Sequence, residues 1–323
     1  MKIRYLIFIL ACVVLYSCTK IKEPTKPAEL SATATLTATE NSTGTQTVTV
    51  TATHTQTASE SATHTATATV TPTHTATSTP TQLIIVIEAV SGYRQWSDGS
   101  YACSCAEYLS PSAPYCYAGV TGDGPYKIQI GTDIIRVWCD MTRQGGGWTL
   151  VLLNSPYVTP PQPSWAELVN EENISGSMTS GLNSFDQFLG VKYWNSLGST
   201  LMLEAGSSAN NISHRASYTF TLDAANSFRI FLSDESILIN AGGTASPGLY
   251  TYSNGAKLSS RDADNDARSA GNCCTLYGNT AWWNLNCWSG SFWGGGTSGS
   301  LQNAAYWSGA TTEYFAWGAM WVR

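Results

Sequence analysis

The chain is poor in charge. Only 12% of its 323 residues are Asp, Glu, Lys or Arg, and the formal net charge is −6. No basic patch is present to neutralise a phosphate backbone, so we expect no nucleic-acid partner. Low charge with abundant Trp, Tyr, Gly, Ser and Asn is typical of exported proteins rich in strands and loops.

Histidine is also scarce, which weakens the hypothesis of an enzyme. Of the four histidines, only His214 lies after residue 82. No Gly-x-Ser-x-Gly segment marks a nucleophile at a strand–helix turn, and no His/Cys spacing of a zinc site stands out. The carboxylates of Glu204, Asp234 and Glu235 could act in catalysis, but nothing in the sequence brings them together. We therefore predict that the chain is not an enzyme.

Apolar runs long enough to span a bilayer are absent. The apolar run Tyr5–Tyr16 follows a basic start and fits a signal peptide. It ends in Leu15-Tyr16-Ser17-Cys18, which resembles the lipobox of bacterial lipoproteins, although Tyr16 is larger than the usual residue. The resemblance implies that residues 1–17 are removed and that lipid on Cys18 anchors the exported protein to a bacterial envelope membrane, facing outside. An ordinary cleaved signal, with Cys18 incidental, is the alternative.

Residues 18–82 lack the side chains of a core. They are mainly Thr, Ala, Ser and Val with scattered Pro, a composition that buries too little apolar surface to fold. His54, His64 and His74 recur every ten residues. A metal site is one interpretation of them; we favour copies of one repeat. We expect a disordered stalk at residues 18–82 and one folded domain at residues 83–323.

The folded part should be rich in strands. Apolar and β-branched runs predict strands, and spacing predicts a helix over Asp186–Leu197. Residues 240–315 hold Gly, Ser, Asn and aromatics without periodicity, and a bound ion or a disulfide is the natural means of ordering such a region. The predicted strands are Leu83–Ile87, Tyr126–Ile130, Ile134–Trp138, Trp148–Leu153, Leu201–Glu204, Ser217–Leu222, Phe228–Ser233 and Ala319–Val322.

The cysteine count after Cys18 is odd. The seven residues are Cys103, Cys105, Cys116, Cys139, Cys273, Cys274 and Cys287. In an oxidising compartment most of them should form disulfides, and at least one is left over.

The segment Arg261–Cys287 carries the densest chemistry. Asp262, Asp264 and Asp266 alternate along it, and their carboxylates are the hard oxygen ligands that calcium prefers. The pair Cys273-Cys274 and Cys287 then enclose a tryptophan pair. An acidic loop, a disulfide loop and aromatic residues together favour a binding site over a catalytic one.

A second string gives this segment a context. Cys139-Asp140-Met141-Thr142 is followed by Gly145-Gly146-Gly147-Trp148-Thr149, which resembles the fibrinogen-like C-terminal domain. The acidic loop, Trp282-Trp283, Phe188-Leu189-Gly190 and the terminal Met320–Arg323 are similar to family segments too. The resemblance covers about residues 103–323 and implies an α+β fold, with a twisted antiparallel sheet, short helices and a loop-rich second half that binds calcium and ligand.

The resemblance also implies how the cysteines pair. It predicts the disulfides Cys105–Cys139 and Cys274–Cys287. Cys103 could then pair with Cys116, which would leave Cys273 as the odd thiol, and a different pairing that involves Cys273 stays open.

By the same resemblance calcium is the cofactor. It would be held by the side chains of Asp264 and Asp266 and by main-chain carbonyls near Arg268 and Ala270, with Asp262 in an outer shell. The stretch between Asp266 and Cys274 is longer here than in the family, which affects the carbonyl positions. The alternative is an acidic solvated turn.

The resemblance finally implies a ligand pocket beside the calcium loop. Fibrinogen-like lectins, such as ficolins and tachylectins, hold an N-acetyl group there, next to a cis peptide bond that corresponds to Asn286–Cys287. The matching pocket residues here are Trp283, Asn286, Cys287, Trp288 and Tyr306, with Trp307 as an alternative to Tyr306. The alternative for Trp282 and Trp283 is that both belong to the core. Trp288 replaces a histidine common in the family.

Two functions follow as hypotheses. The first is a surface-displayed, calcium-dependent module that recognises glycans or N-acetylated groups, since tryptophan faces stack on sugar rings. The second is a structural or adhesive envelope protein that binds a protein partner without lectin activity.

Overall fold

The computed structural model divides the chain into two units, Met1–Thr81 and Gln82–Arg323. In the first unit, strands β1 (Thr37–Thr39) and β2 (Thr47–Thr49) pair antiparallel, which departs from the expectation of a stalk without secondary structure. The structure describes residues 37–39, 47–49, 84–155, 162–241, 247–276, 278, 280–287, 291–293, 305–307 and 314–323. Cys18 and the histidines of the repeat lie outside the described residues. Searched over those residues, no helix is both long and apolar enough to cross a membrane.

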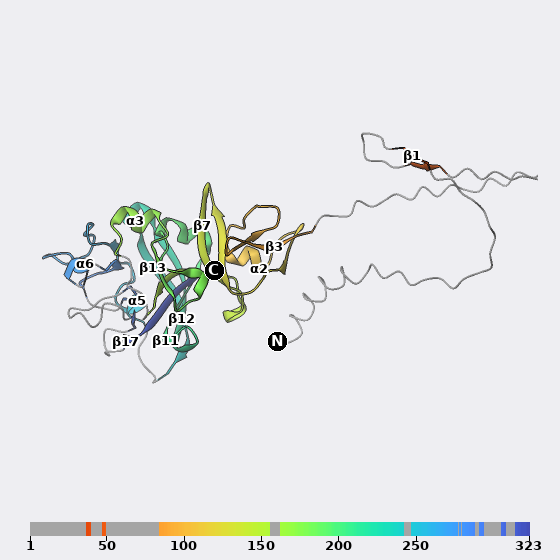
Figure 1. The fold of residues 1–323 in the computed structure, drawn as a ribbon. Coiled ribbons are helices and arrows are strands. Elements are labelled where there is room, and N and C mark those ends of the chain that lie inside the picture. Colours follow the sequence, from red (N-terminus) through yellow and green to blue (C-terminus); the bar gives the residue numbers. More distant parts are fainter. Residues whose placement is uncertain are drawn as a thin grey trace, which may run out of the picture. The chain divides into compact units, whose positions relative to one another are not determined.

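A twelve-stranded sheet forms the centre of the second unit (Figure 1). Ten strands follow the order β13-β12-β11-β18-β8-β7-β6-β4-β3-β5, and β10 and β9 extend it from β8. Most neighbours are antiparallel, as predicted, but β3 with β5 and β4 with β6 are parallel. The bounds are β3 (Ile85–Val90), β4 (Tyr93–Trp96), β5 (Tyr115–Gly119), β6 (Gly124–Ile130), β7 (Asp133–Asp140), β8 (Trp148–Asn154), β9 (Ile174–Gly176), β10 (Phe185–Phe188), β11 (Thr200–Ser208), β12 (Asn211–Asp223), β13 (Arg229–Asn240) and β18 (Trp317–Val322).

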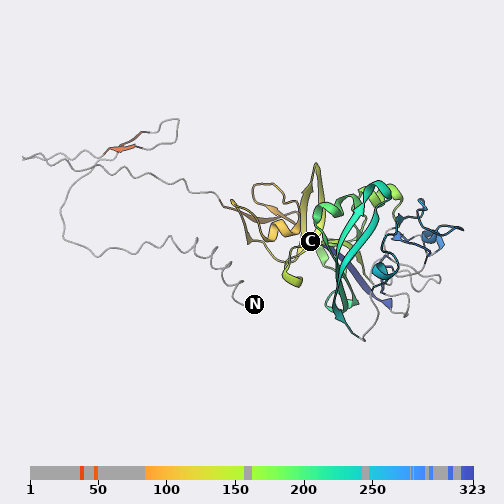
Figure 2. The same ribbon diagram turned by 180° about the vertical axis from the view of Figure 1, so that it is seen from behind.

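The helices are short and lie around this sheet, which together give an α+β fold. Figures 1 and 2 show α6 at one end of the unit and α2 at the other. The second half of the unit also contains two small two-stranded sheets, β14 with β15 and β16 with β17. The bounds are α2 (Cys105–Leu109), η1 (Arg143–Gly145), α3 (Trp165–Asn170), η2 (Met178–Ser180), η3 (Val191–Tyr193), α4 (Trp194–Leu197), η4 (Ala224–Asn226), α5 (Gly248–Thr251), β14 (Leu258–Ser259), α6 (Cys273–Leu276), β15 (Trp282–Trp283), β16 (Ala305–Tyr306) and β17 (Tyr314–Phe315).

The helix predicted over Asp186–Leu197 is wrong for the residues before Val191. Phe185–Phe188 is strand β10, paired with β8 on one side and β9 on the other. All four of its side chains are buried, so neither alternation nor helical spacing marks it, and a short buried run is ambiguous by periodicity alone. The helical turns begin only at Val191.

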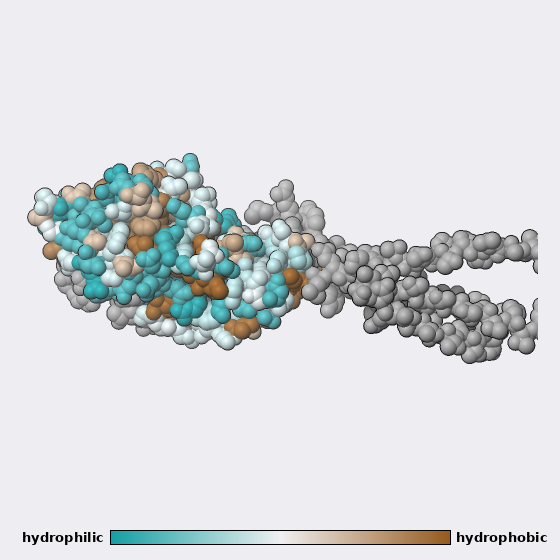
Figure 3. All heavy atoms as spheres, turned by 90° about the horizontal axis from the view of Figure 1, so that it is seen from above, coloured by the Kyte–Doolittle hydropathy of each residue, from teal (hydrophilic) through white to brown (hydrophobic). Residues whose placement is uncertain are grey.

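Both faces of the sheet are covered. On β8, Trp148 and Leu150 pack in one cluster with Trp321, whereas Val151 and Leu152 pack in the larger cluster on the other face. The larger cluster holds the tryptophans of the loop-rich half. Figure 3 shows hydrophilic and neutral residues over much of the viewed surface, with apolar residues in small separate groups. On this face the apolar side chains are therefore turned mainly inward.

The glycine string before β8 lies where two other segments of the chain come close to its backbone. Gly146 and Gly147 have φ of 73° and 77°, where only glycine is comfortable. A Cβ on Gly146 would overlap the carbonyl oxygen of Met141, and one on Gly147 would lie 2.9 Å from the Cα of Ala106. The predicted Cys105–Cys139 disulfide is confirmed in the same place, joining α2 to β7.

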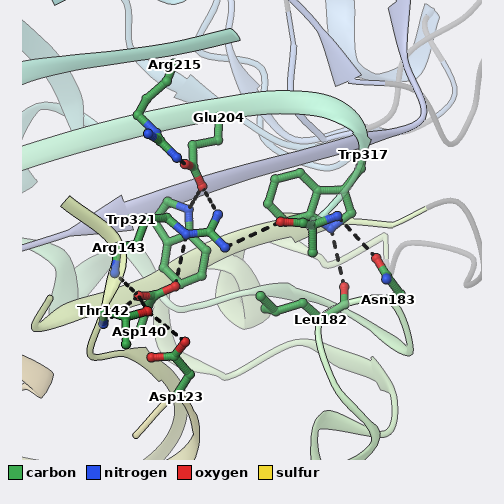
Figure 4. A network of polar contacts seen from close by, with 11 residues as sticks. Asp123, Asp140, Thr142, Arg143, Leu182, Asn183, Glu204, Arg215, Trp317 and Trp321 are labelled. Atoms are coloured by element: carbon green, nitrogen blue, oxygen red, sulfur yellow. Dashed lines mark hydrogen bonds and ion pairs between the residues drawn. The ribbon is translucent and has the colours of Figure 1, made fainter. Parts of the chain in front are cut away.

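A buried acid explains the Asp140-Met141-Thr142 part of the motif. Asp140 accepts a hydrogen bond from the main-chain N–H of Arg143 (2.6 Å) and forms an ion pair with its Nε (3.0 Å). The guanidinium of Arg143 then reaches Glu204, whose side chain is fully buried. Figure 4 shows Glu204 between Arg215 on one side and Arg143 with Trp321 on the other. The motif therefore places the positively charged guanidinium of Arg143 beside the carboxylate of Glu204 on β11.

Candidate functional site

The acidic loop is built on the two-stranded sheet β14–β15. Leu258 pairs with Trp283 and Ser259 with Trp282. The Oγ of Ser259 accepts a hydrogen bond from the main-chain N–H of Asn265 (3.0 Å), and the Nδ2 of Asn265 donates to the carbonyl of Leu258 (2.9 Å). The loop from Leu258 to Asp266 is therefore closed by its own side chains.

Asp262 fastens the loop to helix α3. Its Oδ1 accepts hydrogen bonds from the main-chain N–H of Trp165 and from the Oγ of Ser260, both at 2.8 Å. Trp165 is the first residue of α3, where an unpaired N–H favours a carboxylate partner. These contacts give Asp262 a structural role. The outer-shell role toward an ion, which the resemblance implied, has no support in these contacts.

Asp264 and Asp266 share one end of the loop. Oδ1 of Asp266 accepts from the main-chain N–H of Arg268 and Oδ2 from that of Cys273, both at 2.8 Å. Asp264 is exposed beside it. Partial burial raises the pKa of Asp264, and the nearby charge of Asp266 raises it further. Two carboxylates in contact repel each other, and this repulsion is what a bound cation relieves.

The donor set fits a cation only with help from main-chain oxygens and water. No group of three His, Cys, Asp or Glu side chains able to hold a metal occurs among the described residues. Calcium takes six to eight oxygens, so Asp264 and Asp266 could supply the charge and main-chain carbonyls, such as those of Arg268 and Ala270, part of the remainder. Both of these residues follow the acidic pair in the same irregular segment of the chain.

The disulfide of the loop differs from the one expected. Cys287 is bonded to Cys273, not to Cys274, so the predicted Cys274–Cys287 bond is wrong, and so is Cys273 as the odd thiol. Adjacent residues at the start of α6 point in different directions. Cys274 is fully buried, and its Sγ accepts from the Nδ2 of Asn284 at 3.5 Å. The structure also shows no disulfide between Cys103 and Cys116, both of which it describes.

Asn272 is a residue of this site that our sequence analysis missed. Its Nδ2 donates to the carbonyl of Ser260 and its Oδ1 accepts from the main-chain N–H of Cys274, both at 2.7 Å. It thus caps α6 and ties that helix to the acidic loop. The signal was available, because Asn is favoured directly before a helix.

Trp283 does not line a surface pocket, which corrects the prediction. It is fully buried, its Nε1 donates to the carbonyl of Phe228 at 2.8 Å, and its ring packs 5.5 Å from that of Trp194. Trp282 is equally buried. The pair belongs to the core because β15 turns both side chains away from solvent.

The predicted cis bond is also wrong. The only cis peptide bond among the described residues is Ala113–Pro114, so Asn286–Cys287 is trans, and Cys287 has a φ of 57°. Asn286 is exposed and Cys287 buried. Trp288 lies outside the described residues. Tyr306 is in β16, and its side chain is outside them as well.

The acidic loop and the Asn286 segment are physically joined. The main-chain N–H of Ala267 donates to the carbonyl of Leu285 at 2.6 Å, and the guanidinium of Arg268 lies 3.6 Å from the Sγ of Cys287. Leu285 is 40% exposed, so an apolar side chain and an amide are presented next to the acidic pair. This arrangement suits binding, and its residues do not form a nucleophile–base pair.

The fold and this loop define a fibrinogen-like globe domain. Fibrinogen-like protein A of Apostichopus parvimensis is 30% identical over 223 residues, which cover 64% of this chain and 73% of that protein. Fibrinogen-like protein 1-like protein of Gallus gallus is 28% identical over 202 residues, or 58% of this chain and 66% of that protein. No protein-family model matches the chain.

Solved structures support the same fold. The fibrinogen-like globe domain of human ANGPTL6 superposes with a TM-score of 0.53 at 24% identity, covering 69% of this chain and 95% of that domain. A lamprey fibrin D-dimer, solved with the peptide Gly-His-Arg-Pro-amide, gives 0.54 at 19% identity, covering 69% and 74%. The chain belongs to the fibrinogen-like family. That relationship supports a ligand-binding module in general.

Proposed function

We propose that the protein is a surface-displayed, calcium-dependent binding module that recognises glycans or N-acetylated groups and has no catalytic activity. The observation that carries this is the Asp264–Asp266 pair, in which Asp266 accepts a hydrogen bond from the main-chain N–H of Cys273, a member of the Cys273–Cys287 disulfide. The lipobox-like Leu15–Cys18 supports export and a lipid anchor at Cys18, and the Thr-rich segment supports display away from the membrane.

Calcium would act by ordering the loop. Asp266 accepts from the N–H groups of Arg268 and Cys273, and Ala267 donates to Leu285. A cation on the two carboxylates would neutralise their repulsion and hold the Arg268 turn in place. Through the Ala267–Leu285 bond it would also fix the position of Asn286. The ion need not touch the ligand.

The ligand surface is built from exposed residues rather than from Trp283. The amide of Asn286 offers both a donor and an acceptor to a hydroxyl or acetamido group. Leu285 supplies apolar contact beside it. Trp288 and Tyr306 stay predictions as aromatic walls, since tryptophan and tyrosine faces stack well on sugar rings.

A direct experiment uses the full-length chain in detergent on a glycan array, with and without EDTA. Calcium-dependent hits that Asp264→Asn and Asn286→Ala abolish support the proposal. Glu171→Gln, a change at an exposed carboxylate far along the chain, is the matched control and should bind as wild type. Calcium titration calorimetry on the same variants should give a dissociation constant on the order of 10⁻⁴ M, as in extracellular modules.

A protein or peptide partner is the second candidate. The lamprey D-dimer, which shares the fold, was solved with a peptide ligand. If no glycan on the array binds in a calcium-dependent way while calorimetry still detects calcium binding, the hypothesis of an adhesive protein replaces that of a lectin. If calorimetry detects no calcium and Asp264→Asn changes nothing, the calcium part fails.

A further inference from the structure

A second polar cluster lies away from the acidic loop, where β8 meets β10. It consists of Asn154, Ser155 and Asp186, which are all fully buried. Four of their side-chain atoms have no hydrogen bond of ordinary length and angle: Oδ1 and Nδ2 of Asn154, Oγ of Ser155 and Oδ2 of Asp186. The Ser155 side chain nevertheless lies near enough to Asp186 to lower the pKa of that carboxyl, against the larger effect of burial. A buried polar atom without a partner costs about 1–3 kcal/mol, and native proteins keep few of them. Three of these four atoms are oxygens that a bound cation could take as ligands, whereas Nδ2 of Asn154 is a hydrogen-bond donor that a cation leaves without a partner. The three oxygens in three neighbouring residues indicate that a bound species satisfies them.

The strand register brings the three residues together. Gln187 pairs with Leu153 and Phe188 with Leu152, so Asp186 stands opposite Asn154 on the same face of the sheet. The main-chain N–H of Ser155 donates to Oδ1 of Asp186 at 2.5 Å. This bond fixes the carboxylate and leaves Oδ2 as its unpartnered oxygen. The strand register and this bond therefore place the three residues beside one another.

The charge of Asp186 is not balanced by the protein. Among the described residues, no Lys, Arg or His forms an ion pair with it. Phe188 and Leu152 on the same face belong to the large apolar cluster. A carboxylate in such surroundings needs a counter-charge or a proton.

We propose that Asp186, Asn154 and Ser155 form a buried site for a hard cation, such as Na⁺, K⁺ or Ca²⁺. One carboxylate oxygen, one amide oxygen and one hydroxyl oxygen are the ligand types that these ions prefer, and the set contains no soft or imidazole ligand that would favour zinc or copper. The site is independent of the Asp264–Asp266 loop. It stabilises the junction of β8 and β10, beneath the aromatic residues of the loop-rich half.

The test measures Tm of the full-length chain in a background that lacks the loop site, Asp264→Asn with Asp266→Asn. This background separates the inference from the proposed function, because it removes loop calcium and keeps the buried cluster. Burial raises the pKa of Asp186 to about 7, so the scans are run at pH 8 and at constant ionic strength, with choline chloride as the reference salt. Na⁺, K⁺ and Ca²⁺ are tested separately.

A cation at ten times its dissociation constant should raise Tm by about 3 to 6 °C relative to choline. Asp186→Asn should abolish the rise. Ser155→Ala keeps the charge, removes one ligand and should weaken apparent cation affinity several-fold, so it keeps the test valid should Asp186→Asn not fold. Ser177→Ala, an exposed serine, should leave the rise intact.

Two results would overturn the site. One is that Na⁺, K⁺ and Ca²⁺ each give the background chain the same Tm as choline chloride does. The other is an equal rise in Ser155→Ala, Asp186→Asn and the background chain, which would show a non-specific salt effect. An Asp186→Asn chain that is more stable than its background in every salt would point to a protonated carboxyl and buried water in place of a cation.

Discussion

Arg215 donates from Nε to Oε1 of Glu204 at 2.6 Å, while Glu204 is fully buried between strands β12 and β18. The other carboxylate oxygen takes the guanidinium of Arg143 and the indole N–H of Trp321 at 2.9 Å. Both arginine side chains are mostly buried. One acid on β11 thus joins the motif turn, the C-terminal strand and β12 (Figure 4).

Replacing Glu204 with Gln should therefore destabilise the domain by about 3–5 kcal/mol, since it leaves the mostly buried guanidinium of Arg215 without an anion and leaves that of Arg143 with Asp140 alone. Urea unfolding at neutral pH measures this. The exposed Glu171→Gln should change the free energy of unfolding by no more than about 0.5 kcal/mol. A loss under 1 kcal/mol for Glu204→Gln would show that the network contributes little to stability.

Two glycines with positive φ should differ in how well they tolerate a side chain, because Gly146 combines a ψ of −178° with a close neighbour. Gly146 and Gly99 both have positive φ, 73° and 84°, but a Cβ on Gly146 would meet the carbonyl of Met141, whereas one on Gly99 would meet nothing within 4 Å. Gly99→Ala should cost about 1 kcal/mol, from the conformation alone. Gly146→Ala should cost clearly more, and thermal unfolding of the two variants compares them. Equal losses would mean that the approach of Met141 relaxes freely.

Asp262 and Asp264 should behave differently although they are two residues apart. Asp262→Ala removes the acceptor for the N–H of Trp165 and for Ser260, so it should lower stability by about 1 kcal/mol and leave calcium affinity within about threefold. Asp264→Asn should instead lower calcium affinity and leave the stability of the calcium-free protein nearly unchanged. Calorimetry and urea unfolding on both variants give the two numbers. A larger loss of calcium affinity in Asp262→Ala would make Asp262 a ligand after all.

Much of the fold could be predicted because strands leave a local signal. The run Trp148–Leu153 is apolar and begins after a glycine string, and β8 begins at Trp148. The strand β10 could not be identified, since it is only four residues long and carries Asp186 and Gln187 at its centre, although all four side chains are buried. Its character depends on neighbours that are distant in sequence.

The site was less predictable for a similar reason. Nothing local distinguishes Cys273 from Cys274 as the partner of Cys287; the direction of each side chain at the start of α6 decides it. Nor does an aromatic residue show by itself whether it faces ligand or core, and the hydrogen bond from Trp283 to Phe228 settles that it faces the core. The carboxylates of Asp264 and Asp266 were found because their spacing is itself the signal.

Cys274 gives the protein a pH-dependent stability above neutrality. Burial, in the first place, raises the pKa of its thiol from 9.0 to about 12. Below pH 9 the native and unfolded chains both hold this proton, so the contribution is fully present. Between pH 9 and 12 the unfolded chain releases the proton and the native chain does not, so stability falls as pH rises.

At pH 10, which is one unit above the pKa of the thiol in the unfolded chain, the loss of stability attributable to Cys274 should be about 1.4 kcal/mol. Urea unfolding at pH 8 and pH 10 on wild type and Cys274→Ala measures it, because the alanine variant lacks the titrating group and should lose less by that amount. Cys103→Ala is a comparison at an exposed thiol outside the two disulfides, whose pKa partial burial and the charge of Glu107 also raise; because that side chain is exposed, its removal should change the loss of stability less than the removal of Cys274 does. If Cys274→Ala and wild type lose the same amount between pH 8 and pH 10, the thiol of Cys274 is not protonated and buried in the native protein as the structure has it.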